Sequence, residues 1–183
     1  MFELDVSITQ WINGLSGRVS FLDHFMILVS SIGVPLLVAS VAAQWWLRSN
    51  RTYTRHVLLA AGLSFLLGLG VNQIILLFVQ RLRPYDNGIT HLLIDRSADP
   101  SFPSDHATAS LAIAAAFLIH GLSKRGFLYL SAAFLVMFSR VYIGIHYVSD
   151  VLGGAMIGVC AAGFIVFAFR PGTRVDKIIT GIL

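Results

Sequence analysis

Three polar residues at the junction of two apolar segments have the types and spacing of a site for phosphoryl chemistry. Arg140, His146 and Asp150 lie in the stretch 139–150, which reads Ser-Arg-Val-Tyr-Ile-Gly-Ile-His-Tyr-Val-Ser-Asp. His146 and Asp150 are four positions apart, so a helical turn would place them on one face, where the carboxylate can hold the imidazole in one tautomer. Arg140 supplies a planar cation suited to phosphate oxygens. Such a set indicates attack on a phosphoryl group.

Two further polar clusters precede this stretch. One runs from Arg81 to Pro84 and the other from Pro103 to His106. In the second cluster we expect a helix to start, with Pro103 in its first turn, Ser104 as its cap and free backbone N–H groups that cradle an anion. Two histidines with several arginines meet the needs of in-line phosphoryl transfer: one imidazole attacks phosphorus, the other protonates the leaving oxygen, and the cations stabilise the transition state.

The composition is that of a membrane protein. Of the 183 residues, 56% are hydrophobic and 12% are charged, against about 25% charged in soluble domains. The net charge of +4 comes from basic residues dispersed between apolar segments, which favours loops beside a bilayer over nucleic-acid binding. Nothing marks a linker or a repeat, so residues 1–183 are expected to form one domain.

The long apolar segments of the sequence predict an all-α integral membrane protein, a helical bundle of about five transmembrane helices. Residues 2–15 are amphipathic but too short and too polar to span, so they are expected to form an interfacial helix. We expect the spans at 25–47, 57–79, 104–120, 127–145 and 148–169. A short basic connection at 48–56 separates the first two spans, and another at 123–126 separates the third from the fourth. A basic tail follows the fifth span.

Counting charges orients the predicted bundle. The 48–56 loop, the 123–126 turn and the tail hold eight of the thirteen Lys and Arg residues, and the opposite side holds eight of the nine acids. Because positive loops stay in the cytoplasm, the 81–103 loop and the 139–150 stretch are predicted to face outward. Arginines on the outer side run against this rule, and an anion site there would explain them.

The three clusters together resemble the signature of the type 2 phosphatidic acid phosphatase family. That signature reads Lys, six residues, Arg-Pro; then Pro-Ser-Gly-His; then Ser-Arg, five residues, His, three residues, Asp. The third block is matched in full, and the resemblance covers residues 72–150. Two positions depart from it: Leu76 stands where the family has its lysine, and Asp105 replaces the glycine.

The resemblance implies a role for each matching residue. His146 would be the nucleophile that forms a phosphohistidine, Asp150 would orient it, and His106 would protonate the leaving oxygen. The expected phosphate-binding groups are Arg83, Ser104, Arg140 and the backbone near Asp105, with Arg81 or Arg96 as replacements for the missing lysine. The family works without a metal or cofactor, and the sequence shows no metal-ligand spacing.

The two departures resemble one branch of this family, the BcrC-type undecaprenyl-pyrophosphate phosphatases of bacteria. This implies a plasma-membrane enzyme whose outward-facing site converts undecaprenyl pyrophosphate to the monophosphate and recycles the carrier lipid for cell-wall synthesis. A phosphatidylglycerophosphate or phosphatidic acid phosphatase is the alternative within the family. Outside it stand a transporter or channel subunit, which should carry charges in mid-span, and a vanadate haloperoxidase, which is soluble. The sequence leaves the oligomeric state open.

Overall fold

The chain folds into a bundle of helices with helix α4 at its centre. The computed structural model describes residues 2–47 and 51–181, and this part of the chain contains seven α-helices and no strand. They are α1 (Phe2–Asn13), α2 (Ser20–Leu47), α3 (Arg51–Leu76), α4 (Asp105–Ile119), α5 (Ser123–Tyr142), α6 (Val148–Ala168) and α7 (Arg174–Thr180). The predicted all-α class is therefore confirmed.

Helix α4 can be central because its residues are small. It packs against α3, α5 and α6, and every residue from Ala107 to Phe117 is buried. A Cβ at Gly154 of α6 would lie 2.5 Å from the carbonyl oxygen of Ser104, so α6 can approach α4 this closely only with glycine there. This close contact matters for function because α4 and α6 begin beside each other with His106 and Asp150 in their first turns.

Three helices, α2, α3 and α6, are long and apolar enough to cross a membrane. Their outer surfaces expose large apolar side chains such as Leu36 and Phe164, as expected for lipid-facing helices. Helix α4 is apolar but has only 15 residues, which corresponds to about 22 Å at 1.5 Å per residue. The chain is a multi-pass membrane protein, and the count of five spans stays a prediction.

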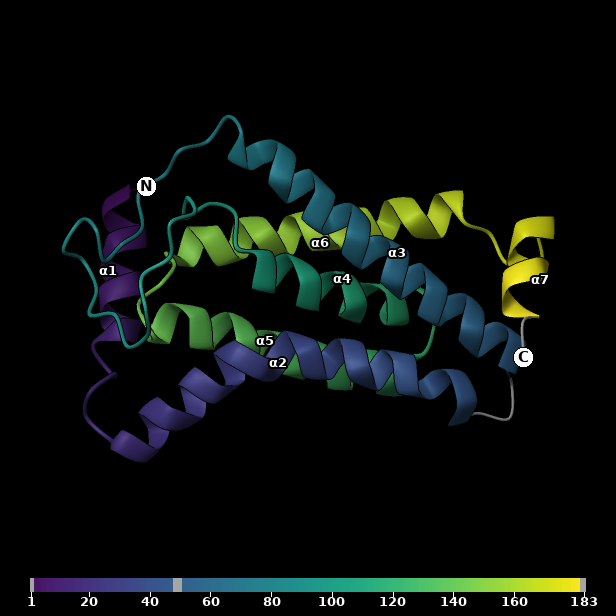
Figure 1. Cartoon of the computed structure of the whole chain (residues 1–183), viewed down its shortest axis with the longest axis horizontal. Helices are drawn as coiled ribbons and strands as arrows, with labels where there is room; N and C mark the ends of the chain where they lie inside the picture. Colours follow the sequence, from purple (N-terminus) through teal and green to yellow (C-terminus); the bar gives the residue numbers. More distant parts are fainter. Residues whose placement is uncertain (1, 48–50, 182–183) are drawn as a thin grey trace.

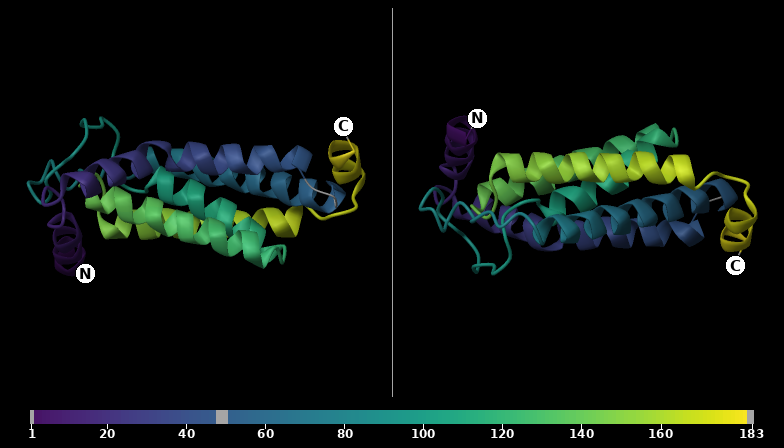
Figure 2. Two further views of the ribbon diagram at one scale, coloured as in Figure 1. Left: turned by 90° about the horizontal axis from the view of Figure 1, so that it is seen from below. Right: turned by 90° about the horizontal axis from the view of Figure 1, so that it is seen from above.

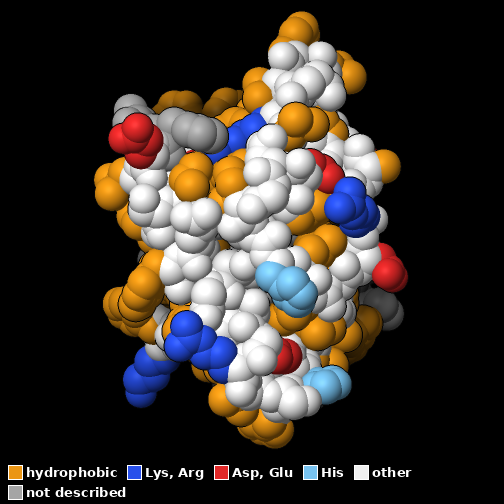
Figure 3. Space-filling model, turned by 90° about the vertical axis from the view of Figure 1, so that its left-hand side faces the viewer, with side chains coloured by type: hydrophobic (Ala, Val, Ile, Leu, Met, Phe, Trp, Pro, Cys, Tyr) orange, Lys and Arg blue, Asp and Glu red, His pale blue; other side chains and the backbone are white. Residues whose placement is uncertain are grey.

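The two ends of the bundle differ in what they carry. Helix α1, the segment 77–104 and the α5–α6 junction gather at one end, while α7 and the α4–α5 turn lie at the other (Figures 1 and 2). This arrangement agrees with the predicted alternation of the chain. At the first end, charged and histidine side chains are interspersed among apolar ones (Figure 3).

Several predicted boundaries were wrong. Lys124 and Arg125 were expected in a turn but lie in the first turn of α5, and the predicted 48–56 loop is mostly helix, because α3 begins at Arg51. Residues 48–50 lie outside the described part of the chain. Helix α7 was not predicted; its Asp176 carboxylate lies 2.8 Å from Nδ1 of His56 on α3, which docks the tail on the bundle.

Candidate active site

One cavity brings the three sequence clusters together. It has a volume of about 230 Å³ and lies at the end of the bundle that carries α1. Arg83, His106, Arg140 and His146 line it, together with Asp105. These residues come from the 77–104 segment, the start of α4, the end of α5 and the α5–α6 junction, so elements far apart in the sequence meet in one site.

His146 is held in the tautomer that a nucleophile needs. Its side chain is almost fully buried, and Nδ1 lies 2.8 Å from the carbonyl oxygen of Ser101. Because a carbonyl only accepts hydrogen bonds, Nδ1 carries the proton and Nε2 keeps its lone pair. Burial lowers the pKa of His146 to about 4, with the nearby Arg140 and Arg83 acting in the same direction. The imidazole is therefore neutral and nucleophilic at pH 7.

The tight junction between α5 and α6 places His146 at the cavity. Gly144 has a positive φ of 84°, a conformation that glycine adopts without strain. A Cβ at this position would also collide with the backbone carbonyl of His91. The chain can thus leave α5 at Tyr142 and enter α6 at Val148 within a few residues, with His146 between the two helices.

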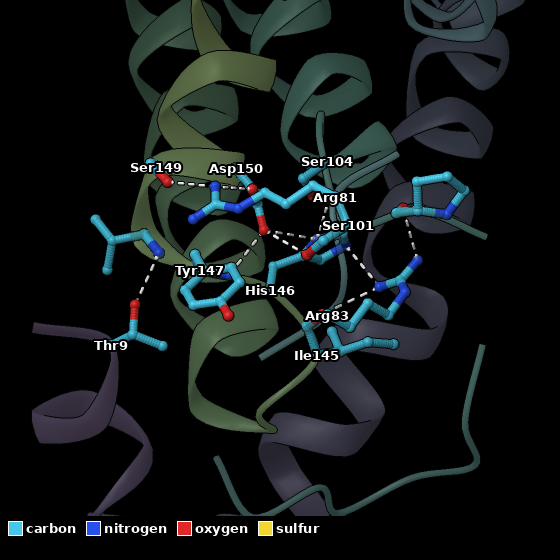
Figure 4. A network of polar contacts seen from close by, with 12 residues as sticks. Thr9, Arg81, Arg83, Ser101, Ser104, Ile145, His146, Tyr147, Ser149 and Asp150 are labelled. Carbon is cyan, nitrogen blue, oxygen red and sulfur yellow. Dashed lines mark hydrogen bonds and ion pairs between the residues drawn. The ribbon is translucent and has the colours of Figure 1, made fainter. Parts of the chain in front are cut away.

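Asp150 lies beside His146 but does not bond to its ring. The distance from its Oδ2 to Nδ1 of His146 is 3.7 Å, too long for a hydrogen bond. Oδ2 accepts instead from Ser101 Oγ at 2.5 Å and from the backbone N–H of Tyr147 at 2.9 Å (Figure 4). The expectation that the carboxylate itself fixes the tautomer is corrected here: Asp150 holds Ser101, whose carbonyl oxygen is the acceptor for His146.

Two guanidinium groups supply the positive charge of the cavity. Arg83 donates from Nε to the Asp99 carbonyl at 2.9 Å and from Nη1 to the Ile145 carbonyl at 3.0 Å, and burial lowers its pKa. Arg140 donates to Ser30 Oγ of α2, and its buried Nε has no hydrogen-bond partner in the described part of the chain. An unsatisfied buried donor beside a cavity is a group that a bound anion would satisfy.

The two departures from the family pattern both lie at this cavity. Leu76, which stands at the place of the family lysine, lines the cavity with its apolar side chain. Asp105 also lines it, and its Oδ1 accepts a hydrogen bond of 2.7 Å from Asn72. Asn72 is buried and also donates to Thr108 at 2.9 Å. The cavity is therefore less positive than the family pattern alone would suggest.

Two predicted substrate-binding residues lie elsewhere. Arg81 does not line the cavity; its guanidinium binds Asp5 at 2.8 Å and Asp150 at 2.5 Å, and its Cζ lies 4.0 Å from the centre of the Tyr147 ring. We therefore drop the expectation that Arg81 contacts substrate. Arg96, the other proposed replacement for the lysine, is exposed and pairs with Asp86 at 3.3 Å.

Ser104 is the N-cap of α4, as predicted, but Pro103 precedes the cap and does not lie in the first turn. The hydroxyl of Ser104 is buried and has no hydrogen-bond partner among the described residues, and Ser104 itself is not part of the cavity wall. Its neighbours Pro103 and Asp105 do line the cavity. Within residues 2–47 and 51–181, no group of three or more His, Cys, Asp or Glu side chains could hold a metal ion.

The chain matches a family model described as the PAP2 superfamily over residues 57–173. It is 36% identical over 178 residues to the Bacillus subtilis protein named undecaprenyl-diphosphatase BcrC, an alignment that covers 96% of this chain and 90% of the relative. It is 30% identical over 165 residues to a Bacillus licheniformis protein named bacitracin transport permease protein BcrC, covering 89% and 79% of the two chains.

A solved structure has the same fold. It is described as a transmembrane PAP2 type phosphatidylglycerolphosphate phosphatase from Bacillus subtilis and superimposes with a TM-score of 0.66 at 26% identity. The superposition covers 94% of this chain and 87% of that chain. The helical bundle described above is thus the fold of a membrane phosphatase.

Proposed function

This chain belongs to the PAP2 superfamily of membrane lipid phosphatases, and we propose that it hydrolyses undecaprenyl pyrophosphate to undecaprenyl phosphate and inorganic phosphate without a metal. The observation that carries the proposal is the cavity in which two histidines meet two buried arginines while Leu76 occupies the place of the family lysine. The undecaprenyl-diphosphatase from B. subtilis, 36% identical over nearly the whole chain, supports the choice of substrate.

The proposed reaction has two steps. Nε2 of His146 attacks the terminal phosphorus, the bond from phosphorus to the bridging oxygen breaks, and His106 gives a proton to that oxygen as the lipid monophosphate leaves. His106, now neutral, takes a proton from a water molecule whose oxygen attacks the phosphorus of the phosphohistidine; the bond from phosphorus to Nε2 breaks, inorganic phosphate leaves and the His146 imidazole is restored. Arg83 and Arg140 stabilise the charge on the equatorial oxygens in both steps.

The membrane surroundings suit a lipid substrate. Helix α3 lines the catalytic cavity with Leu76 and, closer to its start, contributes Phe65 to an apolar hollow of about 240 Å³ that Ile113 of α4 also lines.

The charge distribution suggests which side of the membrane the cavity faces. If successive helices cross the membrane in alternate directions, the basic residues of 48–56, 123–126 and the tail fall on the side opposite the cavity. We therefore propose that the site faces the outside of a bacterial plasma membrane.

The test is phosphate release by the detergent-purified protein with EDTA present. Undecaprenyl pyrophosphate, phosphatidylglycerophosphate and phosphatidic acid are offered in parallel, and we expect the pyrophosphate to be hydrolysed with the highest kcat/KM. Preference for a glycerolipid would keep the mechanism and overturn the substrate. Loss of activity in EDTA that is restored by a divalent metal would overturn the metal-free mechanism.

Two other functions have specific support. The structural neighbour described as a phosphatidylglycerolphosphate phosphatase favours a glycerolipid substrate, and the relative named as a transport permease favours transport. A transport pathway should carry ionisable groups in mid-helix. In α6 the single ionisable acid, Asp150, lies in the first turn, which favours a site at the end of the bundle over a pathway through it.

Replacing Leu76 by lysine tests what sets the substrate preference. The new ammonium group would enter the cavity wall beside Asp105 and add one positive charge for a terminal phosphate. We expect Leu76→Lys to raise the ratio of phosphatidic acid to undecaprenyl pyrophosphate turnover by about tenfold, the equivalent of one charged hydrogen bond. Leu76→Met controls for the change of shape, and an unchanged ratio in Leu76→Lys would show that position 76 does not govern substrate choice.

A further inference from the structure

Helix α1 turns a row of polar side chains toward the bundle, while three of its large apolar side chains point outward. Asp5, Thr9 and Asn13 follow the helical spacing of four residues and are buried or half-buried. On the other side, three large apolar residues are exposed: Leu4, Ile8 and Trp11. This pattern suits a helix seated in the membrane interface, but it leaves the inward polar row to be explained.

Each polar side chain of the row binds backbone next to the catalytic elements. Thr9 Oγ1 accepts the N–H of Val148 at 3.1 Å (Figure 4), and Asp5 Oδ1 accepts the N–H of Ser149 at 2.9 Å. These are the first two N–H groups of α6, which have no partner within their own helix. Asn13 donates to the carbonyl oxygens of Tyr142 at 2.8 Å and His91 at 2.9 Å. Helix α1 thus caps α6 and, through Asn13, connects the segment 77–104 to the end of α5.

A chain of four hydrogen bonds, the first three of them charge-assisted, continues from α1 to the candidate nucleophile. Asp5 Oδ2 accepts from Nη2 of Arg81 at 2.8 Å, and Nη1 of the same guanidinium donates to Asp150 Oδ1 at 2.5 Å. Asp150 then accepts from Ser101 Oγ, and the Ser101 carbonyl accepts from His146 Nδ1 at 2.8 Å. The links connect α1, the segment 77–104, the start of α6 and the α5–α6 junction, and of these residues only His146 lines the cavity.

We propose that Asp5 and Arg81 are positioning residues, through which α1 holds Asp150 and the Ser101–His146 pair in the orientation for attack on phosphorus. The inference rests on the proposed function, because it assigns the pair to the attacking step. The negative charge of Asp5 is needed because of its contact with Arg81. Its carboxylate balances the second half of the Arg81 guanidinium, so that the cation is fixed at both ends by charge-assisted bonds. Without it, Nη2 loses its charged partner, and the guanidinium is held only from the other side, by the Nη1 bonds to Asp150 and Ser149 and by the Tyr147 ring.

The expected effect is on rate and not on binding. In the proposed mechanism the substrate phosphate meets Arg83 and Arg140, whose hydrogen bonds within the described part of the chain go to elements other than α1. The direction of the His146 lone pair, by contrast, depends on the chain from Asp5. Misplacement of a reacting group by about 1 Å can cost about 100-fold in rate. We therefore expect Asp5→Ala to lower kcat by between about 10-fold and 100-fold and to leave KM within about twofold.

The experiment compares four variants on phosphate release from undecaprenyl pyrophosphate by purified full-length protein. They are Asp5→Ala, Asp5→Glu, Arg81→Ala and the double variant Asp5→Ala/Arg81→Ala, with Glu3→Gln as the matched control on the exposed side of α1. If the two residues act as one unit, the double variant has the kcat of Arg81→Ala alone, and Asp5→Glu recovers part of the loss. Independent, multiplicative losses or a rise in KM alone would overturn the inference.

A second measurement does not depend on activity. Hydrogen exchange of the amides at residues 147–150 should rise in Asp5→Ala and stay at the parent rate in Glu3→Gln, because Asp5 accepts one of these N–H groups directly. Unchanged exchange together with unchanged kcat would overturn the positioning role while phosphatase activity stands. A parent protein without phosphatase activity on any lipid would instead overturn the proposed function, and the exchange result would then report only on the capping of α6.

Discussion

Alanine at position 146 is expected to lower phosphate release by at least about 10⁴-fold while the protein stays folded. The reason is that Nε2 of His146 is the proposed attacking atom, and removing a covalent nucleophile costs about this much in enzymes that use one. The structure adds that Nδ1 of His146 is engaged by the Ser101 carbonyl at 2.8 Å, so Nε2 is the ring atom that keeps its lone pair for attack. The measurement is initial rate of phosphate release from undecaprenyl pyrophosphate, with circular dichroism to check folding.

A matched control is His91→Ala, because His91 is exposed and does not line the cavity. Brief reaction with substrate carrying a labelled terminal phosphate, followed by alkaline denaturation, should leave label on the parent protein and on His91→Ala but not on His146→Ala. Label that persists on folded His146→Ala would place the covalent step on another residue, with His106 the next candidate in the cavity.

The sequence predicted the membrane helices and the cavity residues for different reasons. Long apolar segments are a direct consequence of bilayer thickness, so α2, α3 and α6 could be located to within a few residues of their ends. The cavity residues could be grouped because Arg83, His106, Arg140 and His146 all fall at span ends that alternation places on one side of the membrane. Residues at the same end of a closely packed helical bundle lie near one another, so these four residues meet in one cavity.

The support behind the cavity could not be predicted in the same way. The acceptor for His146 is a backbone carbonyl, and a carbonyl carries no sequence signal. Arg81 was expected to bind substrate as a replacement for the missing lysine, yet its partner Asp5 lies 76 positions earlier in the chain. Residues 2–15 were predicted to form an interfacial helix, and nothing in that prediction assigned a direction to the polar row of Asp5, Thr9 and Asn13. Only tertiary contacts show that this row faces the bundle.

Replacement of His106 by glutamine is expected to show a loss that depends on the leaving group. As the proposed general acid, His106 gives a proton to the departing oxygen, and such a group contributes about 10²-fold to 10⁴-fold. Phosphatidic acid must expel an alkoxide, which is very unstable without the proton, whereas p-nitrophenyl phosphate expels an anion that is stable in water. We expect kcat/KM of His106→Gln to fall by about 10³-fold on phosphatidic acid and by less than about tenfold on p-nitrophenyl phosphate, with undecaprenyl pyrophosphate between them.

The comparison of substrates within one variant is what makes this test specific. A general loss of folding or of phosphate affinity would lower all three rates by a similar factor, because every substrate places the same phosphoryl group between Arg83 and Arg140. His24→Gln is the matched control, since His24 is exposed on α2 and, among the described residues, its hydrogen bonds go to Ser20 of its own helix. An equal loss on all three substrates in folded His106→Gln would contradict the role in protonating the leaving group. A loss confined to kcat, equal on all three substrates with kcat/KM unchanged, would indicate that His106 acts instead in the hydrolysis of the phosphohistidine, a step in which the leaving lipid no longer takes part.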